Sequence, residues 1–431
     1  MKFGLQILIL LFITPLVFAQ SNDVAPLSLQ QVLQITQKNN ASVHASLYQE
    51  LVTKRAINVA KANYFPTLDF QGIDSIGFPG SSPSLGVNGL MGSPYRTGLA
   101  EGLLAQQTLF DFGRTYYNVE TAKKEATLSH QNTRVTSAQV LTLALQTYYD
   151  CSLYRTQRDT WKSLGQESNF IMKEAGHFVQ TGQVSIEDKY LTQSQLEQAN
   201  TAVEFFNERM KQSILELAII MGAPPNTVMC PRLPVVVKAP LRDYGPDESP
   251  FMEVARASLA VSQSQLKKDA ANYLPTFVGV ASVGDMQQSR FVEKQDYAMG
   301  LGLNIPLFNW GTITRVKQDE AQIAFKEQNI VSQRVIVREN ETKFDIVSES
   351  AKIRLRGLYT ELATAQEGYK VAKQRYFNLQ GTLVDLQEAY TDLARVQIEI
   401  NQTRAEVLQA SGSKALLDGA VPMPNPNQVQ M

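Results

Sequence analysis

Two short stretches, LFDFG at residues 109–113 and LFNWG at residues 307–311, are nearly identical and have the same neighbours along the chain. Each follows a run in which apolar residues alternate with small or polar ones, the pattern of a β-strand with two different faces. Each precedes about seventy residues without proline and with very few glycines, the pattern of a very long helix. We interpret both stretches as joints between a strand and a helix.

Two further markers recur in the same order as the joints. ANYFPT at 62–67 returns as ANYLPT at 271–276, and FVQTGQVSIED at 178–188 has a looser counterpart in FNLQGTLVDLQE at 377–388. All the offsets are about 200 residues, so the pattern predicts an internal duplication.

The duplication sets the domain boundaries. We predict a first repeat at 20–222, a linker at 223–249 and a second repeat at 250–419. The linker is rich in proline, and the tail at 420–431 has the composition of a disordered segment.

Residues 1–19 have the pattern of a secretory signal peptide. Lys2 precedes a short apolar run that ends in small residues, with cleavage expected after Ala19. An N-terminal membrane anchor is the alternative, but the run is short for a span and contains Pro15. No later segment has about eighteen uninterrupted apolar residues, so no transmembrane helix is expected beyond the cleavage site.

Each repeat is predicted to contain a helix, two strands and a pair of long helices. The first helices, roughly 27–63 and 250–272, end just before a proline, which disfavours helical geometry in the residue that precedes it. The strands are expected at about 66–77 and 97–110 in the first repeat, with a Gly/Ser/Pro-rich loop at 78–95 between them, and at about 275–285 and 296–308 in the second.

The long helices are expected at 114–222 and 312–419, with hairpin turns at Gly182 and Gly381. The first arm of each hairpin has about 70 residues, and at about 1.5 Å of rise per residue it would be a rod of about 100 Å. At the other end of the rods, Gly113 and Gly311 are expected to relax the backbone at the joints. The aromatic residues beside them suit a membrane interface: Phe110, Phe112, Phe308 and Trp310.

The last strand has two distinct faces. Apolar side chains point one way and small or polar ones point the other, the first set being Tyr297, Met299, Leu301, Leu303, Ile305 and Leu307, and the second Ala298, Gly300, Gly302 and Asn304. Four strands are too few to close a membrane barrel, since the smallest such barrels have about eight. An open sheet cannot lie in lipid, because its edges would leave backbone groups without partners.

The sequence therefore predicts an α+β membrane protein whose sheet closes into a barrel by oligomerisation. Three copies with four strands each would form a barrel of twelve strands. The face with Gly300, Gly302 and Asn304 would line a water-filled lumen, and the helices would continue the tube as a coiled-coil barrel. A soluble strand–turn–helix unit with aromatic core residues is the alternative for the joints.

Little in the sequence indicates catalysis or binding of a cofactor. The 40 basic and 41 acidic residues nearly cancel, so a nucleic-acid partner is not expected. His44, His130 and His177 lack the spacing of metal ligands. Cys151 and Cys230 either form a disulfide in an oxidising compartment or are two buried free thiols. We therefore expect no enzyme, no cofactor and no metal site.

The chain resembles the TolC-like outer membrane efflux protein family over essentially its whole mature length. The resemblance is carried by the ANYFPT and ANYLPT motifs ending each first helix, by LFDFG and LFNWG, and by the G-x-V-S-x-x-D turn at 182–188. It implies a homotrimer in the outer membrane of a Gram-negative bacterium, with a β-barrel and a long periplasmic α-helical barrel. It further implies a periplasmic adaptor (membrane fusion protein) and an inner-membrane pump of the RND, ABC or MFS type as partners.

Acidic residues near the two hairpins are the candidate gate at the far end of the rods. Asp385 and Glu388 share one helix face and would form charged rings in a trimer, and the family pattern implies a gate role for both. Asp188 lies in the matching turn, and Tyr376 falls near a gate tyrosine of the family. Ordinary solvated charges at a helical hairpin are the alternative.

The implied function is a passive exit duct of a tripartite efflux or type I secretion system, exporting drugs, other small molecules or proteins. Gly381 stands where some relatives have a gate arginine, so the closing bonds are expected to differ here. A periplasmic coiled-coil adaptor is the alternative function, and a secreted filament is a third. An adaptor would lack four membrane strands and would carry a small lipoyl-like domain.

Overall fold

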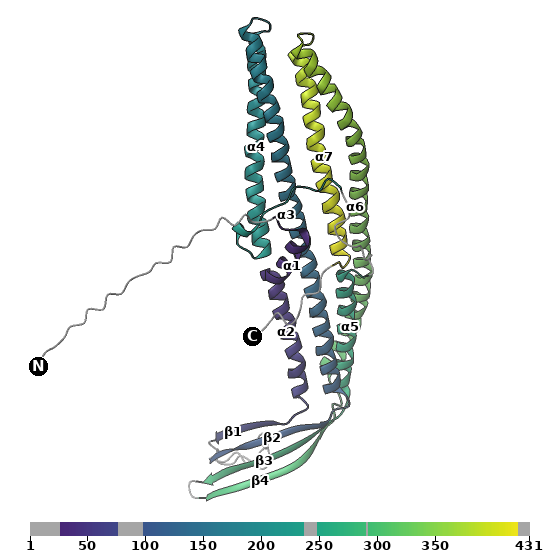
Figure 1. Cartoon of the computed structure of the whole chain (residues 1–431). Coiled ribbons are helices and arrows are strands. Elements are labelled where there is room, and N and C mark those ends of the chain that lie inside the picture. Colours follow the sequence, from purple (N-terminus) through teal and green to yellow (C-terminus); the bar gives the residue numbers. More distant parts are fainter. Residues whose placement is uncertain (1–25, 76–97, 237–247, 290–291, 421–431) are drawn as a thin grey trace, which may run out of the picture.

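The computed structural model of the chain describes residues 26–75, 98–236, 248–289 and 292–420. The predicted signal peptide at 1–19 and the predicted loop at 78–95 lie outside the described residues, as does the predicted tail except for Ala420. The molecule is long and narrow, with a sheet at one end and two helical hairpins at the other (Figure 1).

The two halves have the same order of elements. The first half consists of α1 (Leu29–Asn39), α2 (Ala41–Ala62), β1 (Thr67–Ser75), β2 (Gly98–Phe110), α3 (Arg114–Gln180) and α4 (Ile186–Met221). After the short 3-10 helix η1 (Pro225–Thr227), the second half consists of α5 (Pro250–Ala270), η3 (Ala271–Tyr273), β3 (Thr276–Ser289), β4 (Val292–Asn304), α6 (Trp310–Phe377) and α7 (Leu383–Leu417). The predicted elements are thus present in the predicted order.

The helices lie side by side as a curved layer. α2 and α4 pack on one side of α3, α5 and α7 pack on its other side, and α6 packs on α5 and α7 (Figure 1). Because the helices contact one another along their length, apolar residues are buried in separate clusters along the rods rather than in one central core. No helix in the described ranges has the combination of length and hydropathy needed for a membrane span.

The predicted first helix at 27–63 is wrong in one respect, because the structure breaks it at Asn40. This residue is extended (φ −66°, ψ 129°), and its side-chain oxygen accepts hydrogen bonds from the N–H groups of Ser42 and Val43. It therefore caps α2. Its side-chain amide also donates to the carbonyl oxygen of Ile220 at 2.8 Å, which connects the break to the end of α4.

The first joint has the backbone that its sequence predicts. Phe112 and Gly113 have φ values of 51° and 96°, in the left-handed region that costs a side chain but not glycine. The Asp111 carboxylate accepts hydrogen bonds from the N–H groups of Gly113 at 3.1 Å and of Thr115 at 2.7 Å. The chain therefore turns from β2 into α3 within a few residues.

The second joint is built differently, and the predicted role of Gly311 is wrong. Gly311 lies inside α6 with no left-handed backbone, and Asn309 caps that helix by accepting from the N–H of Thr312 at 3.2 Å. The predicted strand at 296–308 ends at Asn304. Its last two apolar positions, Ile305 and Leu307, lie in the connection, where an asparagine cap replaces the glycine turn.

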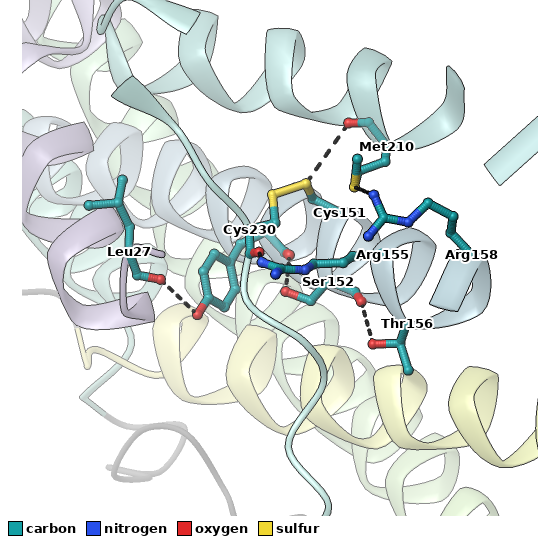
Figure 2. The surroundings of a disulfide bond; sticks show 9 residues. Leu27, Cys151, Ser152, Arg155, Thr156, Arg158, Met210 and Cys230 are labelled. Carbon is teal, nitrogen blue, oxygen red and sulfur yellow. Dashed lines mark hydrogen bonds between the residues drawn. A yellow bond between two sulfur atoms is a disulfide. The ribbon is translucent and has the colours of Figure 1, made fainter. Parts of the chain in front are cut away.

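The two cysteines form a disulfide, so the interpretation as free thiols is wrong. Cys151 of α3 and Cys230 of the linker are buried, with their Cα atoms 5.9 Å apart (Figure 2). Around this bond Arg155 donates to the carbonyl oxygen of Cys230, and the Thr156 hydroxyl accepts from the N–H of Leu233 at 3.0 Å. The first part of the linker is thus fixed to the middle of α3.

Candidate functional site

The sheet is antiparallel throughout, with the order β1-β2-β3-β4. Its register places Phe70 opposite Leu103, Leu103 opposite Val283 and Val283 opposite Tyr297. Because neighbouring positions in register share a face, one face carries an apolar row across all four strands. The opposite face is mixed, with Leu104, Val278 and Val280 among small and polar residues such as Gln106, Ser282, Gly300, Gly302 and Asn304.

The apolar face has no covering layer in the described chain. Tyr297, Met299 and Leu301 are 85%, 90% and 82% exposed. β1 and β4 each have a hydrogen-bonded neighbour on one side only within the described sheet. A long apolar face and two open edges are costly in water, so this sheet needs another environment or other chains.

The joint aromatics lie where the sheet meets the rods. Phe110, Phe112, Phe308 and Trp310 are all exposed, and they pair locally, with ring centroids 4.6 Å apart in the first pair and 6.3 Å apart in the second. Exposed aromatic rings at one level of the molecule are typical of residues at a membrane–water interface.

At the far end of the rods, Tyr376 of α6 and Asp188 of α4 meet. The Tyr376 hydroxyl donates to the Asp188 carboxylate at 3.2 Å. Tyr376 is 1% exposed and packs against Phe178 of α3. Burial raises the pKa of Tyr376, and the nearby Asp188 charge raises it further, so the hydroxyl stays protonated and keeps its role as donor. Two of the four candidate gate residues are therefore brought together, in a contact that the sequence did not predict.

A second contact between the hairpins lies further from the tip, and it is not evident from the sequence. Glu167 of α3 accepts from the Tyr369 hydroxyl at 2.6 Å and forms an ion pair with Lys373 of α6. The Lys373 ammonium also lies 4.8 Å from the centroid of the Phe170 ring. About 200 residues separate the two sides of this cluster, and no local pattern in either helix indicates the other partner.

Burial by itself raises the pKa of Glu167, but the hydrogen bonds from Lys373 and Tyr369 and the charge of Lys373 outweigh it. The pKa of Glu167 is therefore held below its usual range. The carboxylate is charged under ordinary conditions. It joins the two hairpins at a level further from the tip than Tyr376.

Asp385 and Glu388 are not part of this contact. Thr382 and Asp385 form a capping box at the start of α7, with both hydrogen bonds at 3.2 Å. Hydrogen bonds from the Thr382 side chain and from the Thr382 backbone N–H hold the pKa of the exposed Asp385 below its usual range. Glu388 is exposed on the next turn. The structure therefore gives Asp385 a capping contact that the sequence interpretation did not include.

The two hairpin turns also differ from each other. Gly182 has a φ of 71°, as a hairpin glycine should, whereas in the second hairpin Leu379 takes the left-handed position with a φ of 58°. Both glycines lie in their hairpin turns, between α3 and α4 and between α6 and α7, but their backbone conformations differ. Gly381 instead lies close to the end of α6, because an added Cβ would lie 3.1 Å from the Cβ of Arg375.

The histidines have local partners. The His44 ring lies 2.6 Å from the carbonyl oxygen of Lys38, and His130 lies 3.2 Å from the Glu50 carboxylate. His177 is in the last turn of α3. Within the described residues, no three His, Cys, Asp or Glu side chains gather as metal ligands would.

The sequence of the second half matches a known family. A sequence model of the family described as outer membrane efflux protein matches residues 247–419. No curated protein matches the chain.

Several solved structures share the fold over nearly the whole chain. The CmeC outer membrane channel of Campylobacter jejuni has a TM-score of 0.77 at 13% identity, covering 93% of this chain and 88% of that one. VceC, an outer membrane protein of Vibrio cholerae, has a TM-score of 0.75 at 16% identity, covering 91% and 96%. The open state of the MtrE outer membrane channel of Neisseria gonorrhoeae has a TM-score of 0.71 at 17% identity, covering 92% and 90%.

At 13–17% identity, the similarity to these solved structures shows the fold alone. The family model adds a sequence match over the second half of the chain. Family and structures alike are channels rather than enzymes. Residues 247–419 match the outer membrane efflux protein family, and over nearly its whole length the chain has the fold of the outer-membrane channels.

Proposed function

We propose that three copies of this chain form an exit duct in the outer membrane of a Gram-negative bacterium. The observation that carries the proposal is the four-stranded sheet, which exposes an apolar face and has two open edges among its described strands. Pairing β4 of one copy with β1 of the next would satisfy both edges and close a cylinder. The face with Gly300 and Gly302 would then line the lumen.

The helical layer supports the same assembly. Its two free sides, α6 at one edge and α2 with α4 at the other, carry exposed apolar side chains that a monomer leaves in water. On α6 these are Phe325, Val331, Val335, Ile346 and Ile353, and on α2 and α4 they are Val52, Val59, Phe205, Leu215 and Ile219. In a closed ring one edge meets the other edge of the next copy, which would bury both sets.

The matching order of elements supports an internal duplication with repeats at 20–222 and 250–419. Each repeat would supply half of the strands and half of the long helices of one subunit. The predicted signal peptide at 1–19 would direct the chain out of the cytoplasm. Export to the periplasm is also consistent with the disulfide between Cys151 and Cys230, since oxidising compartments preserve such bonds.

The helical tip is the proposed gate. The bond from Tyr376 to Asp188 and the cluster around Glu167 hold the α3–α4 hairpin to the α6–α7 hairpin within one chain. Separating the hairpins would widen the entrance. Asp385 and Glu388 are proposed to form acidic rings at this entrance, with Asp385 also capping α7.

The duct is proposed to work passively with a periplasmic adaptor and an inner-membrane pump, which supply the energy. The cargo is proposed to be drugs, other small molecules or proteins. A deletion strain tested for both drug susceptibility and secreted proteins separates these cargo classes, because a drug duct changes only the first readout and a protein duct changes the second.

The assembly is tested by expressing the full chain, isolating the outer membrane and comparing unheated with heated samples on denaturing gels. We expect an outer-membrane band at the mass of a trimer that converts to the monomer on heating. A chain recovered only as a soluble monomer would exclude the duct.

A further inference from the structure

A cavity of about 340 Å³ lies between α3, α6 and α7, near the middle of the rods. It is distinct from the tip contacts and from the sheet. Six of its lining residues matter here: Gln146 and Asp150 of α3, Phe344 of α6, and Glu406, Gln409 and Ser413 of α7. This volume is in the range of small-molecule sites in proteins.

Asp150 is the unusual member of the cavity. Its carboxylate is half-buried and accepts a hydrogen bond from the Gln409 amide at 2.7 Å. No Lys, Arg or His forms an ion pair with it in the parts of the chain that the structure describes. Burial raises the pKa of Asp150, the Gln409 bond opposes this, and the Glu216 charge adds to the rise. A carboxylate in such a place is stabilised by a cation that enters the cavity.

Two basic residues of α6 and α7 are paired with other carboxylates. Arg354 forms an ion pair with Glu406, and Lys414 lies 2.9 Å from Asp345. No basic side chain is among the residues that line the cavity. The charge of Asp150 therefore faces the cavity with a neutral amide as its hydrogen-bond partner.

The rest of the lining indicates which cation fits. Phe344 supplies an aromatic wall, and the amides of Gln146 and Gln409 with the Ser413 hydroxyl supply hydrogen-bonding groups. A carboxylate combined with an aromatic ring suits a weakly hydrated organic ammonium ion. A small metal ion would instead need several oxygen ligands around one point.

We infer that this cavity binds organic cations with an ammonium group against Asp150 and an apolar body against Phe344. The direction in which the cavity opens in an assembly rests on the proposed function. Ala405 and Leu408 of α7 pack into the core with α1 and the linker, whereas Glu406, Gln409 and Ser413 line the cavity. In a trimer with α1 and the linker outside, three such cavities would open on the lumen and favour cationic cargo.

The test measures binding of benzyltrimethylammonium to the purified full chain in detergent by isothermal titration calorimetry, with benzoate as the anionic counterpart. We expect the ammonium ion to bind and benzoate not to bind. Asp150→Asn, which keeps the size and the acceptor for Gln409, should weaken ammonium binding at least ten-fold. Phe344→Ala should also weaken it.

The matched control is Glu367→Gln on α6, which removes the same charge from a side chain that is 72% exposed, and it should bind as the parent does. Thermal unfolding of each variant shows whether it is folded. A folded Asp150→Asn variant that binds like the parent, or an equal loss in Glu367→Gln, would overturn the inference.

The binding test is independent of the proposed duct, because binding is measured in detergent whatever the oligomeric state of the chain. Asp150-dependent binding by a chain that forms no trimer would reject the duct and keep the cavity. A trimer without such binding would reject the cavity alone.

Discussion

At the scale of single residues, the tip depends on a buried hydroxyl rather than on exposed charge. Tyr376 is enclosed by aromatic rings and donates to Asp188, which is only partly covered. The ring supplies packing, and the hydroxyl supplies the one polar bond between α6 and α4 at this point. Removing the bond while keeping the ring therefore isolates the polar contribution.

Tyr376→Phe is expected to make the tip open more readily. The loss should be about 1 kcal/mol, the usual net value of such a hydrogen bond, because water can reach Asp188 in its place. Single-channel recordings in planar bilayers should show longer or larger openings than the parent. Tyr190→Phe, at a tyrosine that is 65% exposed on α4, is the control and should leave the openings unchanged. Equal behaviour of both variants would contradict the role of Tyr376.

The Glu167 contact predicts a dependence on pH. Its pKa is lowered in the folded state from the ordinary value of 4.5. A depressed carboxyl pKa contributes stability above the unfolded pKa, and this contribution is lost as the pH falls through the folded pKa. The parent should therefore exceed Glu167→Gln in thermal stability at pH 7. The difference should shrink below about pH 4.5, and a constant difference down to pH 2 would contradict it.

At the scale of elements, the disulfide joins parts that the helices alone would leave loosely connected. It ties the linker after α4 to α3, and 79 residues separate its two cysteines. The Tyr148 hydroxyl donates to the carbonyl oxygen of Leu27. Leu27, in the segment before α1, lies near the disulfide (Figure 2). Three chain segments thus converge at the middle of the rods.

Replacing both cysteines by serine should lower the free energy of unfolding by about 2–5 kcal/mol, the usual range for a native disulfide. Denaturant unfolding with and without a reducing agent checks this, since the reduced parent should behave like the variant. Arg232→Ala removes an ion pair in which the arginine is 68% exposed and Asp159 keeps Arg158 as a second partner, so it should cost less than about 1 kcal/mol. A similar loss in both variants would contradict the disulfide as the main connection.

At the scale of the whole molecule, the two faces of the sheet have opposite requirements. Met299 belongs to the exposed apolar face, and Gly300, next along β4, has open space where a side chain would project. If the sheet closes in lipid, a charge on the first face enters the bilayer and a charge on the second enters the lumen.

Met299→Lys should reduce the amount of heat-modifiable trimer in the outer membrane, because a lysine on a lipid face costs about 2–4 kcal/mol near the midplane of the bilayer. Gly300→Lys adds the same charge one residue away and should assemble much more like the parent. Equal yields of the two variants, measured on the same gels, would contradict the assignment of faces.

Periodicity by itself determined the element types, their order and the faces of β4, because alternation and helical spacing are local properties. The sequence also located the hairpin at Gly182, because glycine adopts the left-handed backbone at the end of a helix at little cost. The capping of α2 by Asn40 was missed, because a capping residue competes with helix continuation and the sequence does not show which one wins.

Only the tertiary structure decided which distant residues meet. The pairing of Cys151 with Cys230, the bond from Tyr376 to Asp188 and the cavity at Asp150 join segments that are 79 to 259 residues apart. Each of these contacts forms only when two long helices, or a helix and the linker, are aligned along each other at one particular offset. That offset is set by the summed packing of the rods and is not encoded in either segment alone.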